Sequence, residues 1–238
     1  MILSFYDVTG EMVLPWAEQG LECICFDIQH DWPSRVETFP SGGSIEYRHA
    51  DLYEAGIWST LLDEFGGKSI DMVFGFPVCT DLAVSGAKHW AKKRAVNPHF
   101  QHVAVGRAMD VALFALNVGA PYMVENPVGA MGTIWRKADF YFHPCDYGGY
   151  IPDSQADHPR YPDYIAPRDA YRKKTGIWSG NGFRTPRKNP VEHMPLDKFG
   201  MSRQFSKLGG KSAKTKNIRS ATPRGFARAV WLEHKETL

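Results

Sequence analysis

The chain has 238 residues, of which 43% are hydrophobic and 23% are charged, a composition typical of an ordinary globular protein. It has no apolar run near the roughly 20 residues of a membrane span, and its start, MILSFYDVTGE, lacks the basic residues of a signal peptide. We therefore expect a cytoplasmic protein with no membrane partner. The four cysteines show neither disulfide-framework nor zinc spacing, so no metal is expected.

Charge is divided unevenly along the chain. Residues 1–159 hold 10 Lys and Arg against 20 Asp and Glu, a net charge of −10, whereas residues 160–238 hold 18 against 6, a net charge of +12. A basic final third favours a polyanionic partner such as nucleic acid, although it could instead dock on the acidic part. Residues 209–219, GGKSAKTKNIR, have the composition of a solvated and mobile segment.

The first 125 residues alternate between strand-like and helix-like patterns. Strands are expected at residues 2–6, 21–26, 45–50, 71–74 and 121–124, and helices at 11–19, 57–65 and 99–118. Pro15 would bend the first helix or mark its first turn. The alternation predicts right-handed βαβ units with a mostly parallel sheet, which is the α/β class.

Polar residues stand at the carboxyl ends of the five expected strands, where ligands bind in parallel sheets. They are Asp7 with Gly10, Asp27, Asp51, Cys79 and Glu125. Any one of these acids could be a simple turn or cap residue, but five strand ends in a row indicate a site. One glycine after the first strand and an acid after the second suit an adenosine-bearing cofactor without phosphates, such as S-adenosylmethionine.

Within that site, Asp27 would bind the ribose and Asp51 the adenine amino group. Cys79 and Glu125 add a second signal, because a thiolate beside a carboxyl group suits attack on an electron-poor ring. The thiol would add to the ring, and the acid would hydrogen-bond the ring nitrogen that gains electron density. The alternative is that Cys79 is a buried structural thiol.

The helix–strand pattern breaks near residue 140. Residues 140–200 are rich in Pro, Tyr, Gly and Arg, which indicates a loop-rich lobe with short strands around residues 176–178. Residues 222–232 predict a helix with Thr222 as N-cap and Pro223 in its first position. The expected parts are a catalytic and cofactor-binding domain (1–140), a small basic lobe (141–218) and a C-terminal helix that packs back on the catalytic domain (219–238).

Some residues allow two interpretations. His143, Cys145, Asp146 and His158 could form a zinc site or an ordinary loop. Trp178 and Tyr171, flanked by Arg and Lys, could pack inside the lobe or stack on a nucleobase.

The order of the motifs resembles that of the DNA (cytosine-5) methyltransferases, and the chain is most similar to compact bacteriophage-type members. Residues 76–80 (FPVCT) resemble the Pro-Cys-Gln nucleophile loop, with Ser-Gly following at 85–86, and residues 124–127 (VENP) resemble the Glu-Asn-Val motif. Residues 147–148 with 171–174 (YG, YRKK) resemble the Tyr-Gly and Gln-x-Arg-x-Arg motif. Residues 219–231 (RSATPRGFARAVW) resemble the Arg-x-x-Thr-Pro-x-Glu segment and final helix.

The chain also departs from that pattern. Val78 stands where the family has Pro, and Thr80 stands where it has Gln. The cofactor loop lacks its second and third glycines. Only 44 residues separate Lys174 from Arg219, where the family places a larger target-recognition domain.

The resemblance implies a Rossmann-like, S-adenosylmethionine-dependent methyltransferase fold whose C-terminal helix returns to the cofactor site. It implies methyl transfer to C5 of cytosine in DNA through a Cys79–C6 adduct, in the host cytoplasm if the protein is phage-encoded. The catalytic residues would be Cys79, Glu125, Arg172 and Lys174. The cofactor would contact Tyr6, Asp7, Thr9, Gly10, Asp27, Ile28, Asp51, Leu52, Phe76 and Pro77. Nucleic acid would contact Ser85, Lys173, Lys211, Lys214 and Lys216.

Three alternatives remain open. The same chemistry could act on a free pyrimidine nucleotide such as dCMP, or the chain could be an inactive nucleic-acid-binding relative. An amino-methyltransferase would need Asp/Asn-Pro-Pro-aromatic after the fourth strand, which this sequence does not supply. The reduced cofactor loop also leaves open a donor other than a plain methyl group.

Overall fold

A computed structural model describes residues 1–202, 207–209 and 212–237 of the chain. It contains two compact units, which are described separately. The first, here called the sheet unit, comprises Met1–Gly10, Trp16–Tyr141 and Thr175–Phe183. The second, here called the basic unit, comprises Glu11–Pro15, Phe142–Lys174 and Arg184–Leu238. The three-part division expected from the sequence stays a prediction.

Among the described residues, one eight-stranded sheet has the order β3-β4-β2-β1-β5-β6-β8-β7. The strands β4, β2, β1, β5 and β6 run parallel to one another, whereas β3 and β8 run antiparallel to β4 and β6. The expected α/β class with a mostly parallel sheet is therefore confirmed. The strands are β1 Ile2–Phe5, β2 Glu22–Asp27, β3 Arg35–Thr38, β4 Ser44–His49, β5 Met72–Gly75, β6 Tyr122–Pro127, β7 Phe140–Phe142 and β8 Thr175–Gly180.

The central strands form where the sequence is continuously apolar, because both of their faces are covered. Every residue of β1 and β5 is buried. The Phe5 ring on β1 stacks on Phe26 with 5.0 Å between ring centroids and meets Phe114 edge-on at 5.1 Å. This aromatic cluster joins the middle of the sheet to the helical layer.

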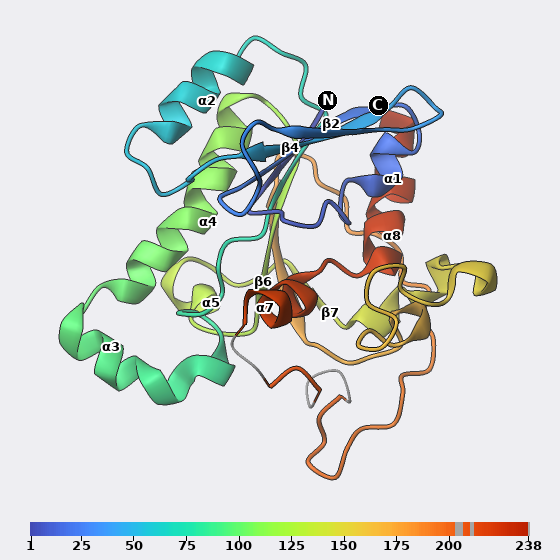
Figure 1. Cartoon of the computed structure of the whole chain (residues 1–238). Coiled ribbons are helices and arrows are strands. Elements are labelled where there is room, and N and C mark those ends of the chain that lie inside the picture. The colour runs from blue at the N-terminus through green and yellow to red at the C-terminus, as the bar shows by residue number, and fades with distance from the viewer. Residues whose placement is uncertain (203–206, 210–211, 238) are drawn as a thin grey trace. The chain divides into compact units, whose positions relative to one another are not determined.

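Helices α2 and α4 lie on one face of the sheet (Figure 1), and α4 contacts both β5 and β6. Gly75 at the end of β5 faces Val111 of α4 so closely that an added Cβ would lie 2.8 Å from the valine Cγ1. The helices are α1 Leu14–Ala17, α2 Ile57–Phe65, α3 Trp90–Val96, α4 Phe100–Asn117, α5 Met131–Ile134, α7 Ala213–Ser220 and α8 Arg224–His234.

Two expectations for the first half of the chain need correction. The helix expected at residues 11–19 is reduced to the single turn of α1, because Pro15 has no N–H and fits only the first turn of a helix. Strand β3 is an additional strand. Its sequence, RVET, is polar and mostly exposed, so it lacks the apolar pattern that identifies the inner strands.

Two further expectations change near the C-terminus. Residues 213–219, where no regular structure was expected, are helical within α7, and the Ser212 side chain caps this helix by accepting from the Thr215 N–H. The final helix begins one residue later than expected, with Pro223 as its N-cap, and Thr222 is buried. The strand expected around residues 176–178 is confirmed as β8.

The basic unit has an aromatic core of its own. Phe226 of α8 stacks on Phe142 with 4.2 Å between centroids and contacts the Tyr147 ring at 5.2 Å. At the start of α8, the Gly225 N–H donates to the buried Asp169 carboxylate at 2.9 Å. Burial raises the pKa of Asp169 to about 6.

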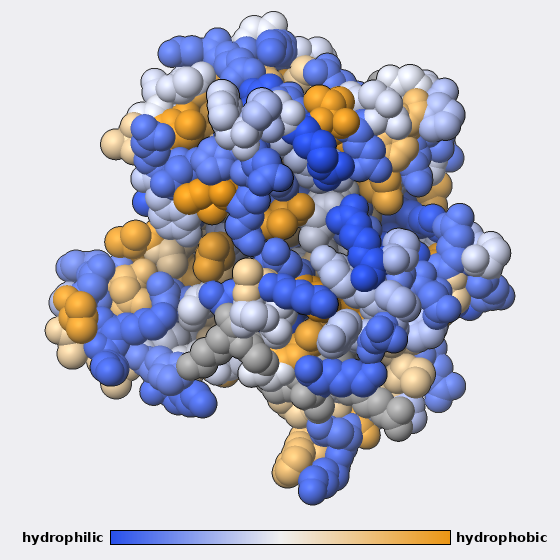
Figure 2. Space-filling model, viewed as in Figure 1, coloured by the Kyte–Doolittle hydropathy of each residue, from blue (hydrophilic) through white to orange (hydrophobic). Residues whose placement is uncertain are grey.

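The structure bears on two alternatives left open for the second half of the chain, a zinc site and aromatic rings that stack on a nucleobase. In the described part of the chain, no group of three or more His, Cys, Asp or Glu side chains is arranged to hold a metal ion. Trp178 and Tyr171 are only 1% and 4% exposed, so their rings pack within their own units. No helix of the described residues is long and apolar enough to span a bilayer. The face seen in Figure 2 is mainly hydrophilic, with separate hydrophobic residues.

The contact between β5 and α4 predicts a strong response to one added methyl group. Gly75→Ala should lower the free energy of unfolding by about 1–3 kcal/mol, because the Val111 side chain must move. Gly106→Ala is the matched control, because nothing lies within 4 Å of an added Cβ at this α4 position. It should raise stability by about 0.5–1 kcal/mol. Urea unfolding measures both, and equal effects would contradict this packing.

Candidate active site

The parallel strands place the polar strand-end residues along one edge of the sheet. Asp7 follows β1, Asp27 ends β2, Asp51 follows β4, Cys79 follows β5, and Glu125 lies near the end of β6. In the β5–β6 pairing, Gly75 lies opposite Val124. Glu125 is therefore the next residue along its strand, and Cys79 lies four residues beyond the same point on the neighbouring strand.

The segment that carries Cys79 is held against the segment that follows Glu125. The Asn126 side-chain amide donates to the Pro77 carbonyl at 3.0 Å, and it does so from a fully buried position. Farther along, the Val84 N–H donates to the Val128 carbonyl at 3.2 Å, and the Ala130 N–H donates to the Leu82 carbonyl at 2.9 Å. Here the paired segments 77–84 and 126–130 are called the loop staple.

Glycine is required within the loop staple. A Cβ at Gly129 would lie 1.8 Å from the Leu82 carbonyl oxygen, so only a residue without a side chain allows this approach. The Cys79 carbonyl also accepts from the Leu82 and Ala83 N–H groups at 3.0 and 2.9 Å, which closes the loop into a compact turn. The backbone around Cys79 is therefore defined on both sides of the thiol.

Cys79 differs from the other three cysteines in its accessibility. Cys23, Cys25 and Cys145 are buried, whereas Cys79 is half-buried, as is Glu125. Burial raises the pKa of the Cys23 and Cys145 thiols, which keeps them protonated and unreactive. The structure thus places the half-buried Cys79 in a defined loop, next along the sheet edge to the half-buried Glu125.

The turn after β1 is organised by Asp7. One carboxylate oxygen accepts from the Thr9 and Gly10 N–H groups at 3.0 and 2.8 Å, and the other accepts from the Ser4 hydroxyl at 2.8 Å. Gly10 has a φ of +69°, and an added Cβ would lie 2.8 Å from the Tyr47 hydroxyl. Packing against Tyr47 therefore accounts for the glycine that the sequence associated with a cofactor loop.

Asp27 and Asp51 also accept from their own turns. Asp27 accepts from the Gln29 N–H at 2.8 Å, and Asp51 accepts from the Tyr53 N–H at 2.9 Å. One oxygen of each carboxylate is thus used locally, as in an ordinary Asx turn. Burial raises the pKa of Asp27.

The other predicted cofactor residues divide between exposed and buried positions. Ile28 is 55% exposed beside Asp27, Phe76 is half-buried, and Leu52 and Pro77 are buried. The Tyr6 hydroxyl is buried and has no hydrogen-bond partner, and burial strongly raises its pKa.

This donor set fits S-adenosylmethionine better than a dinucleotide. Asp51 has an oxygen beyond the one used in its turn, whereas Asp27 also accepts from the Gln29 side chain. The exposed Ile28 side chain offers an apolar surface for a flat ring. The Asp7 turn supplies a carboxylate where a pyrophosphate would need cations or open N–H groups.

The predicted catalytic cations lie in the other unit. Arg172 and Lys174 are exposed residues of the basic unit, and their assembly with Cys79 stays a prediction. Lys173 donates to the Arg219 carbonyl at 3.1 Å and thereby fixes the start of this segment to the end of α7. Lys214 and Lys216 are exposed on α7, whereas Lys211 lies outside the described residues. Ser85 is exposed in the sheet unit, directly after the loop staple.

A basic segment that the sequence analysis missed also follows the loop staple. Residues 82–109 contain no Asp or Glu, although the surrounding residues 1–159 are acidic overall. Within them, residues 84–99 form a 3-10 turn and α3, which lies beyond the N-terminal end of α4 (Figure 1). Exposed cations in this stretch, here called the basic arm, are Lys88, Lys92 and Arg94. Counting charge over 28-residue windows would have found it.

The basic arm is anchored on the Cys79 loop by its remaining cation. Lys93 forms an ion pair with Asp81, two residues after Cys79. The buried Gln101 side chain donates to the Asp81 carbonyl at 3.2 Å and accepts from Arg94 at 3.4 Å. Asp81 therefore connects the candidate nucleophile loop to α3 and α4.

Comparison with known proteins gives no assignment. No protein family and no curated protein matches the chain. Among solved structures, the chain is similar to a prophage-encoded E. coli protein assigned as a DNA modification methyltransferase, with 14% identity and a TM-score of 0.39. The match covers 80% of this chain and 52% of that one, so the chain spans about half of that protein's length. A likeness this weak supports no conclusion about function.

The loop staple predicts a specific change in thiol reactivity. Asn126→Asp replaces the N–H donor to Pro77 with a carboxylate, so the Cys79 loop should open more often. The reaction of Cys79 with a thiol reagent should accelerate about 5- to 30-fold, the equivalent of ~1–2 kcal/mol of lost loop stability. Asn117→Asp, at an exposed amide that donates to the Leu113 carbonyl, is the control. An unchanged rate in Asn126→Asp would show that this bond does not hold the loop.

Proposed function

We propose that the chain is an S-adenosylmethionine-dependent methyltransferase that acts on C5 of cytosine in DNA, with Cys79 as the nucleophile. The observation that supports this most is the loop staple, which fixes the half-buried Cys79 beside the strand that carries Glu125. The proposal also agrees with the order of motifs along the chain. The Cys79 loop follows the strand that pairs with the Glu125 strand, as a shared reaction centre requires.

The chemistry assigns a separate task to each side chain. The Cys79 thiolate forms a bond to C6 of the cytosine ring, which raises electron density at C5. Glu125 hydrogen-bonds N3 and the amino group and thereby stabilises the electron-rich ring. Loss of the C5 proton then breaks the Cys79–C6 bond and restores the free thiol. S-adenosylmethionine would supply the electrophilic methyl group, and Asp27, Asp51 and Tyr6 would hold it.

Supporting residues keep the two reacting groups in place. Asn126 ties the Pro77 carbonyl to the strand end, and Asp81 ties the same loop to α3 through Lys93. Holding a nucleophile in one geometry lowers the entropic cost of attack. A target base in a duplex must leave the stack before Cys79 can reach C6, which costs a few kcal/mol.

The basic arm supports a polyanionic substrate. Three exposed cations, Lys88, Lys92 and Arg94, lie within nine positions of Ser85. They follow the Cys79 loop directly, so a phosphate backbone bound there would lie close to the nucleophile along the chain. A free nucleotide would have little use for several cations spread over two helical turns. This feature favours DNA over dCMP.

The first test is nucleoside mass spectrometry after incubation with S-adenosylmethionine and duplex DNA, single-stranded DNA or dCMP. We expect 5-methylcytosine in a polymer, no product with Cys79→Ala, and a rate about 10²- to 10⁴-fold lower with Glu125→Gln. Cys145→Ala, which alters a buried thiol of the basic unit, should keep the activity. Wild-type protein should also form a covalent adduct with DNA that contains 5-fluorocytosine.

Other outcomes would support one of the alternative functions instead. Product from dCMP alone would make the substrate a free nucleotide. Product that persists in Cys79→Ala would remove the covalent mechanism. Binding of DNA with neither product nor adduct would leave an inactive nucleic-acid-binding relative.

The basic arm predicts the salt dependence of DNA binding. In the triple variant Lys88→Gln, Lys92→Gln, Arg94→Gln, the slope of log affinity against log salt should fall in magnitude by about one for each lost phosphate contact. Lys68→Gln, which removes one exposed cation after α2, is the control outside the arm and should keep the wild-type slope. Fluorescence anisotropy at several salt concentrations measures both. Identical slopes in the triple variant and the control would remove the arm from the DNA interface.

A further inference from the structure

The basic unit contains a small pocket whose walls are mostly apolar or aromatic. Its volume is about 150 Å³. A cavity of this size in another protein holds one benzene molecule, so the pocket has room for a single six-membered ring. The lining residues are Pro162, Asp163, Tyr164, Ile165, Ala166, Pro167, Tyr171, Met194, Ser202 and Lys207.

The pocket lies on a preformed base. Tyr171 and Ile165 are buried in a small cluster with Leu208, Ile218 and Ala221, and Tyr164 packs against it. The chain turns here through main-chain hydrogen bonds, from Ile165 to the Tyr161 carbonyl at 2.9 Å and from Met194 to the Ala170 carbonyl at 2.7 Å. The pocket therefore needs little ordering before a ligand binds.

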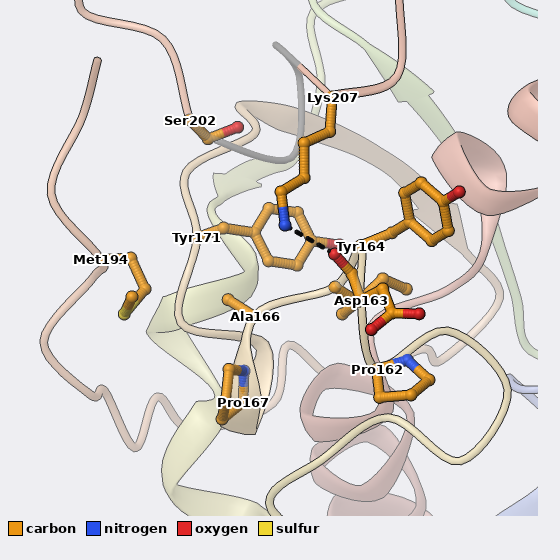
Figure 3. A pocket seen from close by; sticks show the side chains of 10 residues that line it. Pro162, Asp163, Tyr164, Ala166, Pro167, Tyr171, Met194, Ser202 and Lys207 are labelled. Atoms are coloured by element: carbon orange, nitrogen blue, oxygen red, sulfur yellow. Dashed lines mark hydrogen bonds between the residues drawn. The ribbon is translucent and has the colours of Figure 1, made fainter.

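The polar groups stand at the rim. Lys207 reaches over the pocket toward Tyr164, and its ammonium donates to the Asp163 carbonyl at 2.8 Å (Figure 3). In this view Met194 lies across the Tyr171 ring from Tyr164, and the Asp163 carboxylate is exposed. A flat ring in the pocket would thus meet apolar side chains on its faces and both a cation and an acceptor at its edge.

Cations gather next to the pocket residues along the chain. Arg172 and Lys174 follow Tyr171 directly and are exposed. Burial lowers the pKa of His143, and the charges of Arg172, Lys174 and Lys188 lower it further. These three cations therefore lie near one side chain. A ligand with a ring and phosphates matches this combination better than an apolar peptide does.

From these features we infer that the pocket is a binding subsite for one unpaired nucleobase of a single-stranded or locally opened nucleic acid, separate from the reacting cytosine. The base would lie against Tyr164 and Met194, with its edge toward Lys207. Arg172 and Lys174 would hold the neighbouring phosphates. Such stacking tolerates any base and is worth roughly a tenfold change in affinity or more per base. The inference rests on the proposed nucleic-acid substrate but not on the Cys79 chemistry.

The test uses ¹³C-methyl methionine NMR of the full chain, in which Met194 is one of eight methionines. A Met194→Leu variant assigns the signal. Addition of a thymidine trinucleotide should move the Met194 methyl resonance upfield and saturably, through the ring current of the stacked base. A trinucleotide with abasic sugars, which keeps the phosphates, should leave the signal in place. The same shift should occur in Cys79→Ala.

Two variants keep the test decisive. Ala166→Phe fills the pocket and Tyr164→Leu removes a stacking surface, and each should weaken the titration at least about tenfold while the other methionine signals stay unchanged. No Met194 shift with the trinucleotide, an equal shift with the abasic form, or unaltered binding in both variants would overturn the inference. Loss of methylation activity with the Met194 shift intact would instead reject the proposed reaction and leave the pocket standing.

Discussion

The parallel register between β5 and β6 is the constraint on which the candidate site depends. It sets the cysteine loop and the Glu125 strand side by side before any catalytic side chain is considered. The hydrogen bond from Asn126 to the Pro77 carbonyl then holds the Cys79 loop against the Glu125 strand. Because the Asn126 side chain is fully buried, the bond is shielded from competing water. A loss of sheet register would therefore displace the nucleophile loop as well as the strand.

The sequence was informative where one physical effect dominates. Continuous apolar runs identified β1, β2, β5 and β6, because both faces of inner parallel strands are covered. Their parallel order then placed the strand-end acids, Cys79 and Glu125 along one edge. Strand β3 was missed because it is a polar edge strand, and helix α1 was overextended because Pro15 limits it to one turn.

The site could be predicted only at the level of residue types. The loop staple joins residues about 49 positions apart in sequence, and no local pattern reveals that pairing. The acids after the strands also accept hydrogen bonds from the N–H groups of their own turns. An acid at a strand end therefore fits a turn residue and a cofactor-binding residue equally well. The basic arm stayed hidden because its charge was summed with that of acidic neighbours. Tyr171 and Trp178 were ambiguous because aromatic residues suit a core and a nucleobase equally well.

The net charge of +2 for the whole chain hides an uneven distribution of charge within the sheet unit. In the sheet unit, cations are concentrated on the basic arm, while acids line the turns after β1, β2 and β4. A polyanion would be repelled by those turns and attracted by the arm. The distribution thus separates a region suited to a cationic cofactor from a region suited to phosphates within one chain.

The loop staple ends at Val84, which is where the basic arm begins. The basic arm returns to the Cys79 loop through the Lys93–Asp81 ion pair and through Gln101, which donates to the Asp81 carbonyl. Asp81 lies two residues after Cys79, so a phosphate that competes for Lys93 would also weaken a contact of the nucleophile loop. Phosphate binding on the arm and placement of the thiol are therefore coupled through one ion pair.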